Sequence, residues 1–236
     1  MHRTLALFDI DGTLVDTGGA GRAGLLASFR TVFGLDDVAG QASRVRFDGK
    51  TDPTIIADIA LAAGLAAGEA EARYAELQEA YLDALRTHLA LPDPRRRVLP
   101  GVRPLLELLA ARADVVLGLV TGNVEEGARV KLDAFGLNPY FIDGGFASDH
   151  PERAEIARIA HQKLSRRAGF RFPIECVVVI GDTELDVACA QANGFRSIAV
   201  ASGGSPHERL IAAEPDALLA DLTDGDAVLR AMGLSV

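Results

Sequence analysis

One short stretch near the N-terminus constrains this chain more than any other part of it. An apolar run from Leu5 to Phe8 is typical of a buried strand, and it leads to two carboxylates, Asp9 and Asp11, one residue apart. Carboxylates this close repel each other, and burial favours their neutral forms unless a cation or several donors lie nearby. The stretch therefore predicts a strand that presents two acidic groups to a divalent cation, followed by a turn at Gly12.

Beyond residue 100 the sequence alternates between strand-like and helical patterns. Strands are expected at 115–120, 176–180, 197–201 and 217–219, with helices at 102–112, 124–135, 153–167, 184–193 and 226–232. This alternation is typical of a doubly wound parallel sheet, an α/β fold of the Rossmann-like type. Ligands of such sheets bind beyond the carboxyl ends of the strands. Asp9 and Asp11 follow one of those ends.

A helical segment interrupts the α/β pattern after the first strand. Helical spacing covers 22–33, 54–63 and 69–89, and Thr51-Asp52-Pro53 has the residues of a helix start. Gly-rich residues 17–21 and Pro-rich residues 91–94 bound the segment and are typical of hinges. We therefore expect a catalytic core of residues 1–16 and 98–236 and an inserted all-helical domain of residues 17–97.

Composition and charge argue against several classes of protein. The 236 residues include 33 acidic and 24 basic side chains, for a net charge of -9, which disfavours a nucleic-acid partner. No apolar run approaches the roughly 20 residues of a membrane span, and no signal-peptide pattern precedes the first strand. Cys176 and Cys189 are too few for a disulfide scaffold and are expected to be reduced and buried. The chain fits a cytoplasmic enzyme, either a monomer or a homodimer.

Two further strand ends carry polar residues. Thr121, Gly122 and Asn123 stand between a strand and a helix, where a hydroxyl and backbone N–H groups form an anion cradle. Asn123 with Glu126 is also an ordinary helix-capping pattern.

The strand at 176–180 is followed by Asp182 and Asp186. Mg²⁺ prefers oxygen ligands, so Asp182 together with Asp9 and the carbonyl of Asp11 suits this ion. Asp186 allows a second interpretation, because with Thr183 it forms the pattern of a helix capping box.

Together these strand ends resemble the motifs of the haloacid dehalogenase superfamily. The inserted helices resemble the small cap domain found in phosphatase and phosphomutase members of that family. The motifs that carry the resemblance are Asp9-x-Asp11-Gly12-Thr13, Thr121-Gly122-Asn123 and Gly181-Asp182-x-x-x-Asp186.

The resemblance implies a role for each motif. Asp9 is the expected nucleophile and Asp11 the expected general acid and base. Thr121 is expected to hold the phosphate, together with the cradle residues Gly12, Thr13, Gly122 and Asn123. The expected cofactor is Mg²⁺, held by Asp9, Asp11, Asp182 and Asp186.

The third motif departs from the usual family pattern, because Arg153 stands where a lysine is common. An arginine can hold the nucleophile and the phosphate, but its planar fork is not equivalent to an ammonium group. Lys131 is the competing candidate, although its position in the preceding helix puts it about 12 Å from the site by helical rise. Lys50, in the 47–52 loop, is a candidate substrate-binding cation from the cap or else a solvated loop residue.

These observations predict a Mg²⁺-dependent phosphatase for a small phosphorylated metabolite, acting through an aspartyl-phosphate, with phosphoglycolate as the first substrate to test. Three alternatives remain at this point. A phosphoglucomutase-like phosphotransferase would share the chemistry and differ in what the cap admits. A 2-haloacid dehalogenase would use Asp9 without a metal, and a phosphate-sensing module would not turn over.

Overall fold

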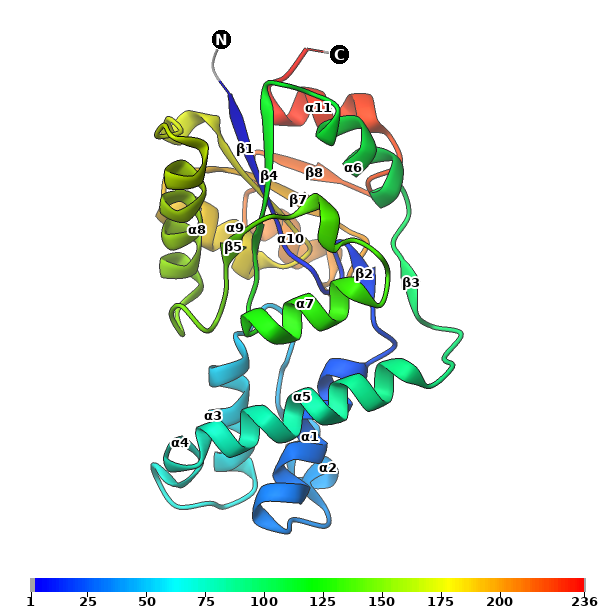
Figure 1. Ribbon diagram of the computed structural model, residues 1–236, viewed down its shortest axis with the longest axis vertical. Coiled ribbons are helices and arrows are strands. Elements are labelled where there is room, and N and C mark those ends of the chain that lie inside the picture. Colours follow the sequence, from blue (N-terminus) through cyan, green and yellow to red (C-terminus); the bar gives the residue numbers. More distant parts are fainter. Residues whose placement is uncertain (1–2, 236) are drawn as a thin grey trace.

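The computed structural model describes residues 3–235 and confirms the α/β fold (Figure 1). Its main sheet is parallel, with the strand order β5-β4-β1-β6-β7-β8. The strands are β1 (Thr4–Phe8), β4 (Val115–Val120), β5 (Gly144–Gly145), β6 (Val177–Gly181), β7 (Arg196–Val200) and β8 (Ala217–Leu219). The strand that carries the acidic pair thus lies in the middle of the sheet.

The side chains of β1 alternate between two hydrophobic clusters, one on each face of the sheet. Leu5 and Leu7 belong to the cluster that includes α8 (Arg153–Ala168), and Ala6 and Phe8 belong to the one that includes α6 (Val102–Ala110) and α11 (Gly225–Met232). All four are fully buried. A central strand covered on both faces reads as a continuous apolar run, which is why this strand was evident in the sequence.

Helices cover both faces of the sheet. The core helices are α6 (Val102–Ala110), α7 (Glu125–Asp133), α8 (Arg153–Ala168), α9 (Glu184–Ala192), α10 (His207–Ala212) and α11 (Gly225–Met232), with short 3-10 turns η2 (Asn138–Tyr140) and η3 (Ile174–Cys176). Helix α10 was not predicted from the sequence, because its six residues are too few to show a helical period. None of the described helices has the length and apolar character needed to cross a membrane.

Between β2 (Val15–Asp16) and β3 (Arg97–Val98), every described element is helical. These elements are α1 (Ala20–Phe33), α2 (Val38–Gln41), η1 (Ala42–Arg44), α3 (Asp52–Ala62), α4 (Glu69–Ala72) and α5 (Tyr74–Ala90). We call residues 17–97 the cap and the other described residues the core. Figure 1 shows the cap at the end of the molecule opposite the two termini.

The two connections between cap and core pair with each other, which the sequence did not predict. Val15 lies opposite Val98 and Asp16 opposite Arg97 in a two-stranded antiparallel ribbon. An ion pair of 3.3 Å joins the Arg97 guanidinium to the Asp16 carboxylate. The two connections therefore run side by side as a short ribbon, next to the predicted hinge residues 17–21 and 91–94.

Two predicted features differ from the structure. The single helix expected at 69–89 is divided at Arg73 into α4 and α5. Both cysteines are free, but only Cys189 is buried, because Cys176 lies in the η3 turn just before β6 and is partly exposed.

Tyr81 carries an unusual buried hydroxyl in the cap. The residue is 2 % exposed and packs against Gly24 of α1, and its hydroxyl has no hydrogen-bond partner among the described residues. Burial raises the pKa of this phenol well above 10. A buried donor without an acceptor is destabilising.

We predict that Tyr81→Phe leaves the free energy of unfolding unchanged or raises it by up to about 1 kcal/mol, since it removes only the unpaired hydroxyl. Urea unfolding measures this, with Tyr74→Phe on the same helix as the control. A loss of more than about 1 kcal/mol would show that the hydroxyl is hydrogen-bonded in solution.

Candidate active site

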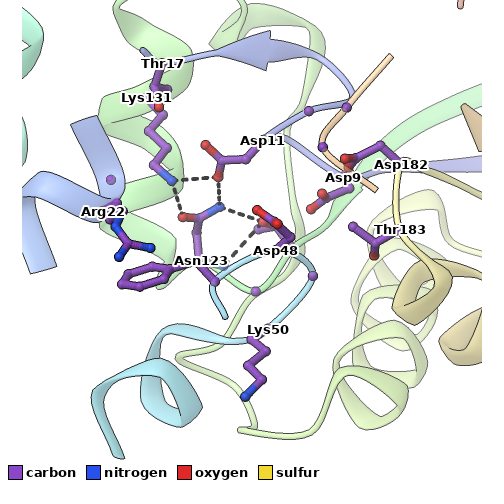
Figure 2. A pocket seen from close by; sticks show the side chains of 18 of the residues that line it. Asp9, Asp11, Thr17, Arg22, Asp48, Lys50, Asn123, Lys131, Asp182 and Thr183 are labelled. Carbon is purple, nitrogen blue, oxygen red and sulfur yellow. Dashed lines mark hydrogen bonds and ion pairs between the residues drawn. The ribbon is translucent and has the colours of Figure 1, made fainter. Parts of the chain in front are cut away.

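A cavity of about 440 Å³ lies between the cap and the carboxyl ends of the central strands. Its walls include residues that follow β1, β4 and β6, together with cap residues from α1, α5 and the 47–52 loop. Figure 2 shows Asp9, Asp11, Asn123, Lys131 and Asp182 around this space. The fold thus gathers the three polar strand ends and the cap around one site.

Three buried carboxylates form a cluster at the cavity, and two of them, Asp9 and Asp182, line it. Asp9 follows β1, Asp182 follows β6, and Asp186 lies in the first turn of α9. Each residue is at most 5 % exposed, and one oxygen from each lies within 4.8 Å of the others. Three ionised carboxylates this close repel one another, so the cluster needs positive charge nearby to stay ionised.

Arg153, the first residue of α8, supplies part of that charge. Its Nη2 lies 2.9 Å from Asp9 Oδ1 and also pairs with the Asp186 carboxylate. Its Nη1 donates to the carbonyl oxygen of Gly49 in the cap at 3.0 Å. One guanidinium therefore joins the candidate nucleophile, the second acidic motif and the cap.

One arginine does not neutralise three acids. Burial raises the pKa of Asp9 to about 7, against the lowering effect of Arg153, and Asp186 and Asp11 raise it further. Burial and the neighbouring Asp9 also raise the pKa of Asp182 well above its ordinary value. A divalent cation would allow both groups to stay ionised, so this donor set fits Mg²⁺.

Asp186 combines both interpretations given for it above. Its Oδ2 accepts from the Thr183 N–H at 3.0 Å and from the Thr183 hydroxyl at 2.6 Å, which is the predicted capping box. Its other oxygen faces Arg153. With both oxygens engaged, Asp186 is suited to orienting the site, and Asp9 and Asp182 are the better-placed carboxylates for a metal.

Asp11 has different partners from Asp9. Its Oδ2 accepts from Lys131 Nζ at 2.6 Å and from Asn123 Nδ2 at 2.8 Å, and Lys131 also donates to Asn123 Oδ1 at 2.6 Å. These three side chains form the closed triangle drawn in Figure 2. The Asp11 side chain remains 41 % exposed, so the triangle fixes it without removing it from the cavity.

The 12 Å separation expected for Lys131 was wrong. Figure 1 shows that α7 lies across the boundary between core and cap and does not point away from the site. A lysine side chain also extends toward the N-terminus of its own helix, here toward the cavity. Arg153 and Lys131 therefore contact different acids and do not compete for one position.

The predicted anion cradle surrounds the same space. Thr121 is fully buried, and its hydroxyl oxygen accepts from the Asn123 side chain at 2.8 Å and the Asn123 N–H at 3.3 Å. Both bonds use the oxygen lone pairs, which leaves the Thr121 proton to donate. Thr13 Oγ1 donates to Asp182 Oδ1 at 3.2 Å and so links the first and last motifs.

Two cradle glycines are required by close approaches. Gly12 has a φ of +82°, and a Cβ there would lie 2.3 Å from an Asp182 carboxylate oxygen. At Gly122 a Cβ would lie 2.2 Å from the Lys50 carbonyl oxygen of the cap. Substituting either glycine would therefore disturb an acid of the cluster or the contact between cap and core.

The structure does not bring the Lys50 ammonium together with the other predicted site residues. Its Nζ pairs with Asp58 of α3 at 2.5 Å, and Figure 2 shows the side chain directed away from the acids. The loop sequence suggested a cation that reaches toward substrate, but Asp58, eight residues later in the cap, neutralises the Lys50 ammonium in an ion pair.

Asp52 is a site residue that was predicted as part of a helix start and of the 47–52 loop, with no role of its own in the site. Thr51 caps α3, whereas the Asp52 carboxylate accepts from the Val124 N–H at the start of α7, at 2.9 Å. The Asp52 N–H donates to the Gly122 carbonyl at 2.7 Å. Burial raises the pKa of Asp52 to about 6, against the lowering effect of Lys131. The cap thus docks directly on the predicted phosphate-binding turn.

Arg22 and Asp48 also line the cavity and were not predicted as site residues. Asp48 belongs to the 47–52 loop, which resembles the family's substrate-facing cap loop, but only Lys50 of that loop was named as a candidate. Arg22 has no such signal and becomes part of the site only through the docking of the cap. Figure 2 shows Arg22 on the side of the cavity opposite Asp182 and Thr183.

We predict that Arg153→Met lowers the free energy of unfolding by about 3 kcal/mol in the presence of EDTA, because it leaves Asp9 and Asp186 buried without their cation. Urea unfolding measures the loss. Arg158→Met is the matched control on the same helix, where an exposed ion pair with Glu155 should contribute less than about 1 kcal/mol. Equal effects of the two substitutions would contradict the buried pairing.

A second prediction follows from the raised pKa of Asp9. Between its ordinary value of 3.8 and about 7, the folded chain holds a proton that the unfolded chain has released. The metal-free protein should therefore lose on the order of 2 kcal/mol as pH rises from 5 to 8, or ~4–8 °C in melting temperature. Mg²⁺ should stabilise it more at pH 8 than at pH 6.

Thermal unfolding of wild type and Asp9→Asn at several pH values checks this. The variant should show a shallower fall with pH, because the titrating group is gone. Parallel curves for the two proteins would show that Asp9 does not titrate in this range.

Known proteins share the sequence pattern and the fold of this chain. The sequence model of one protein family, the haloacid dehalogenase-like hydrolases, matches residues 6–191 of this chain. The probable phosphatase IndB of Dickeya dadantii is 30% identical over 226 residues, covering 92% of this chain and 89% of that protein. Phosphoglycolate phosphatase 1 of Pseudomonas aeruginosa is 33% identical, covering 92% and 76% respectively.

The fold agrees as well. The crystal structure of a predicted phosphatase from Clostridium acetobutylicum superposes with a TM-score of 0.72 at 20% identity, covering 98% of this chain and all of that one. Because the family model spans most of the chain and includes all three acidic and polar strand ends, the chain belongs to the haloacid dehalogenase-like hydrolases.

Proposed function

We propose that this protein is a Mg²⁺-dependent phosphatase that hydrolyses a small phosphomonoester through an aspartyl-phosphate at Asp9. The observation that carries the proposal is the different setting of the two acids that follow β1. Asp9 lies in the acidic cluster beside Arg153, whereas Asp11 is held apart by Lys131 and Asn123. Two neighbouring carboxylates in different environments suit two different roles.

In the first half of the reaction a carboxylate oxygen of Asp9 attacks phosphorus, and the bond from phosphorus to the leaving oxygen breaks. Asp11 gives a proton to that oxygen, so the product leaves as a neutral alcohol. The Thr121 hydroxyl donates to a phosphoryl oxygen, since its own oxygen is already occupied by Asn123. Asp9 and Asp182 would hold a Mg²⁺ ion, which would offset the repulsion between the carboxylate and the phosphate.

In the second half a water molecule attacks phosphorus and the bond to Asp9 breaks. Asp11 accepts the proton that the water loses, which returns it to its starting protonation state. Lys131 and Asn123 keep the Asp11 carboxylate oriented in both halves. Without a second acid in this position, the acyl-phosphate would persist.

A dehalogenase is less well supported. It would need Asp9 for attack on carbon, but neither the second acid at Asp11 nor the three-carboxylate cluster would have a task there. Phosphoglycolate is the first substrate to test, because several relatives carry the name phosphoglycolate phosphatase and the cavity suits a small molecule.

We expect a phosphate-release screen over small phosphomonoesters to show turnover with Mg²⁺ and none with EDTA, with Asp9→Asn as the inactive blank. Halide release from a 2-haloacid that survives EDTA, without phosphate release, would contradict the proposal.

Asp11→Asn should lower kcat by about 10²- to 10⁴-fold on an alkyl phosphate. On p-nitrophenyl phosphate, whose leaving group needs no proton, the same variant should release a burst of about one nitrophenolate per enzyme before it slows. Rapid-mixing absorbance measures the burst. A uniform loss without a burst would contradict the assignment of Asp11 to the second half.

A further inference from the structure

Three of the four cationic side chains that line the cavity already form ion pairs with carboxylates. Lys131 pairs with Asp11, Arg153 pairs with Asp9 and Asp186, and Lys50 pairs with Asp58. Arg22 is the fourth lining cation, and no carboxylate of the described chain lies within ion-pair distance of its guanidinium. Its charge is therefore available to a bound ligand.

The Arg22 side chain is nevertheless held in place. Its guanidinium lies over the Phe47 ring, 4.3 Å from the ring centroid, and Nη2 makes a long bond of 3.4 Å to the Ala42 carbonyl. A cation over an aromatic face retains its outward N–H donors. The stack fixes the plane of the guanidinium, and most of its donors stay free.

Arg22 also lies on the side of the cavity where a leaving group must sit. Asp11, the proposed proton donor to that group, pairs with Lys131, and a methyl group at Gly21 would lie only 3.0 Å from Lys131 Nζ. Figure 2 shows Arg22 on the same side of the cavity as Lys131 and Asn123, the two partners of Asp11. A leaving group that reaches Asp11 from the cavity can therefore extend toward Arg22.

We propose that Arg22 is a specificity-determining residue that binds a carboxylate on the leaving group of the substrate. This deepens the proposed function and rests on it. The fork of an arginine matches a carboxylate with two parallel hydrogen bonds. Six aspartates already line the cavity, so a group with a single negative charge suits Arg22 better than a second, doubly charged phosphate.

The test compares two substrates of nearly equal size, 2-phosphoglycolate and 2-hydroxyethyl phosphate, in wild type, Arg22→Met and Arg22→Lys. Arg22→Met keeps the apolar stem and removes the charge. It should lower kcat/KM for 2-phosphoglycolate by about 10- to 100-fold, mainly through KM, and leave 2-hydroxyethyl phosphate within about twofold. Arg22→Lys should recover only part of the loss, since it keeps the charge without the fork.

Arg30→Met is the matched control, because Arg30 is an exposed arginine in the last turn of the same helix. It should change neither substrate. Equal losses on both substrates for Arg22→Met would assign Arg22 to cap packing and overturn the inference, as would unchanged kinetics on 2-phosphoglycolate.

Two results with the wild-type protein distinguish failure of the Arg22 subsite from failure of the proposed phosphatase function. Wild type that releases phosphate from 2-hydroxyethyl phosphate at least as well as from 2-phosphoglycolate would overturn the carboxylate subsite alone. Wild type that releases phosphate from no ester in the presence of Mg²⁺ would overturn the proposed function and the subsite with it.

Discussion

Mutual repulsion among Asp9, Asp182 and Asp186 is the constraint on which the rest of this structure depends. Their burial at the edge of a central sheet is destabilising unless positive charge is brought to them. Arg153 meets part of that need, and the raised pKa of Asp9 and Asp182 shows that part remains. A site arranged in this way fits a divalent cation, the cofactor of the proposed function.

The cap completes the site by contacts with the same residues that carry the chemistry. Arg153 donates to the Gly49 carbonyl, and Asp52 binds both sides of the turn that follows Thr121. The docked cap therefore holds Arg153 and the turn that follows Thr121 in place together, and it puts Arg22 against the cavity. The position of the cap and the arrangement of the site are linked through these hydrogen bonds.

The sequence predicted the site correctly where the functional side chains directly follow a recognisable strand. The acids Asp9 and Asp182 follow apolar strands, so both the sheet and the acidic cluster were predictable. Lys131 was misplaced because helical rise describes distance along α7, while the tilt of α7 across the site is a tertiary property. Lys50, Asp52 and Arg22 depend on how the cap docks, which no local pattern encodes. The β2–β3 ribbon was missed for the same reason, since its two strands are far apart in sequence and only two residues long.

The central claim is that Asp9 becomes covalently phosphorylated during turnover. The most direct measurement is to quench the protein during steady-state hydrolysis, reduce it with borohydride and identify the modified residue by peptide mass spectrometry. Reduction of an aspartyl-phosphate yields homoserine, so the account predicts homoserine at position 9 in wild type and in larger amount in Asp11→Asn. Phosphate release without any modification at Asp9, or modification at another residue, would contradict it.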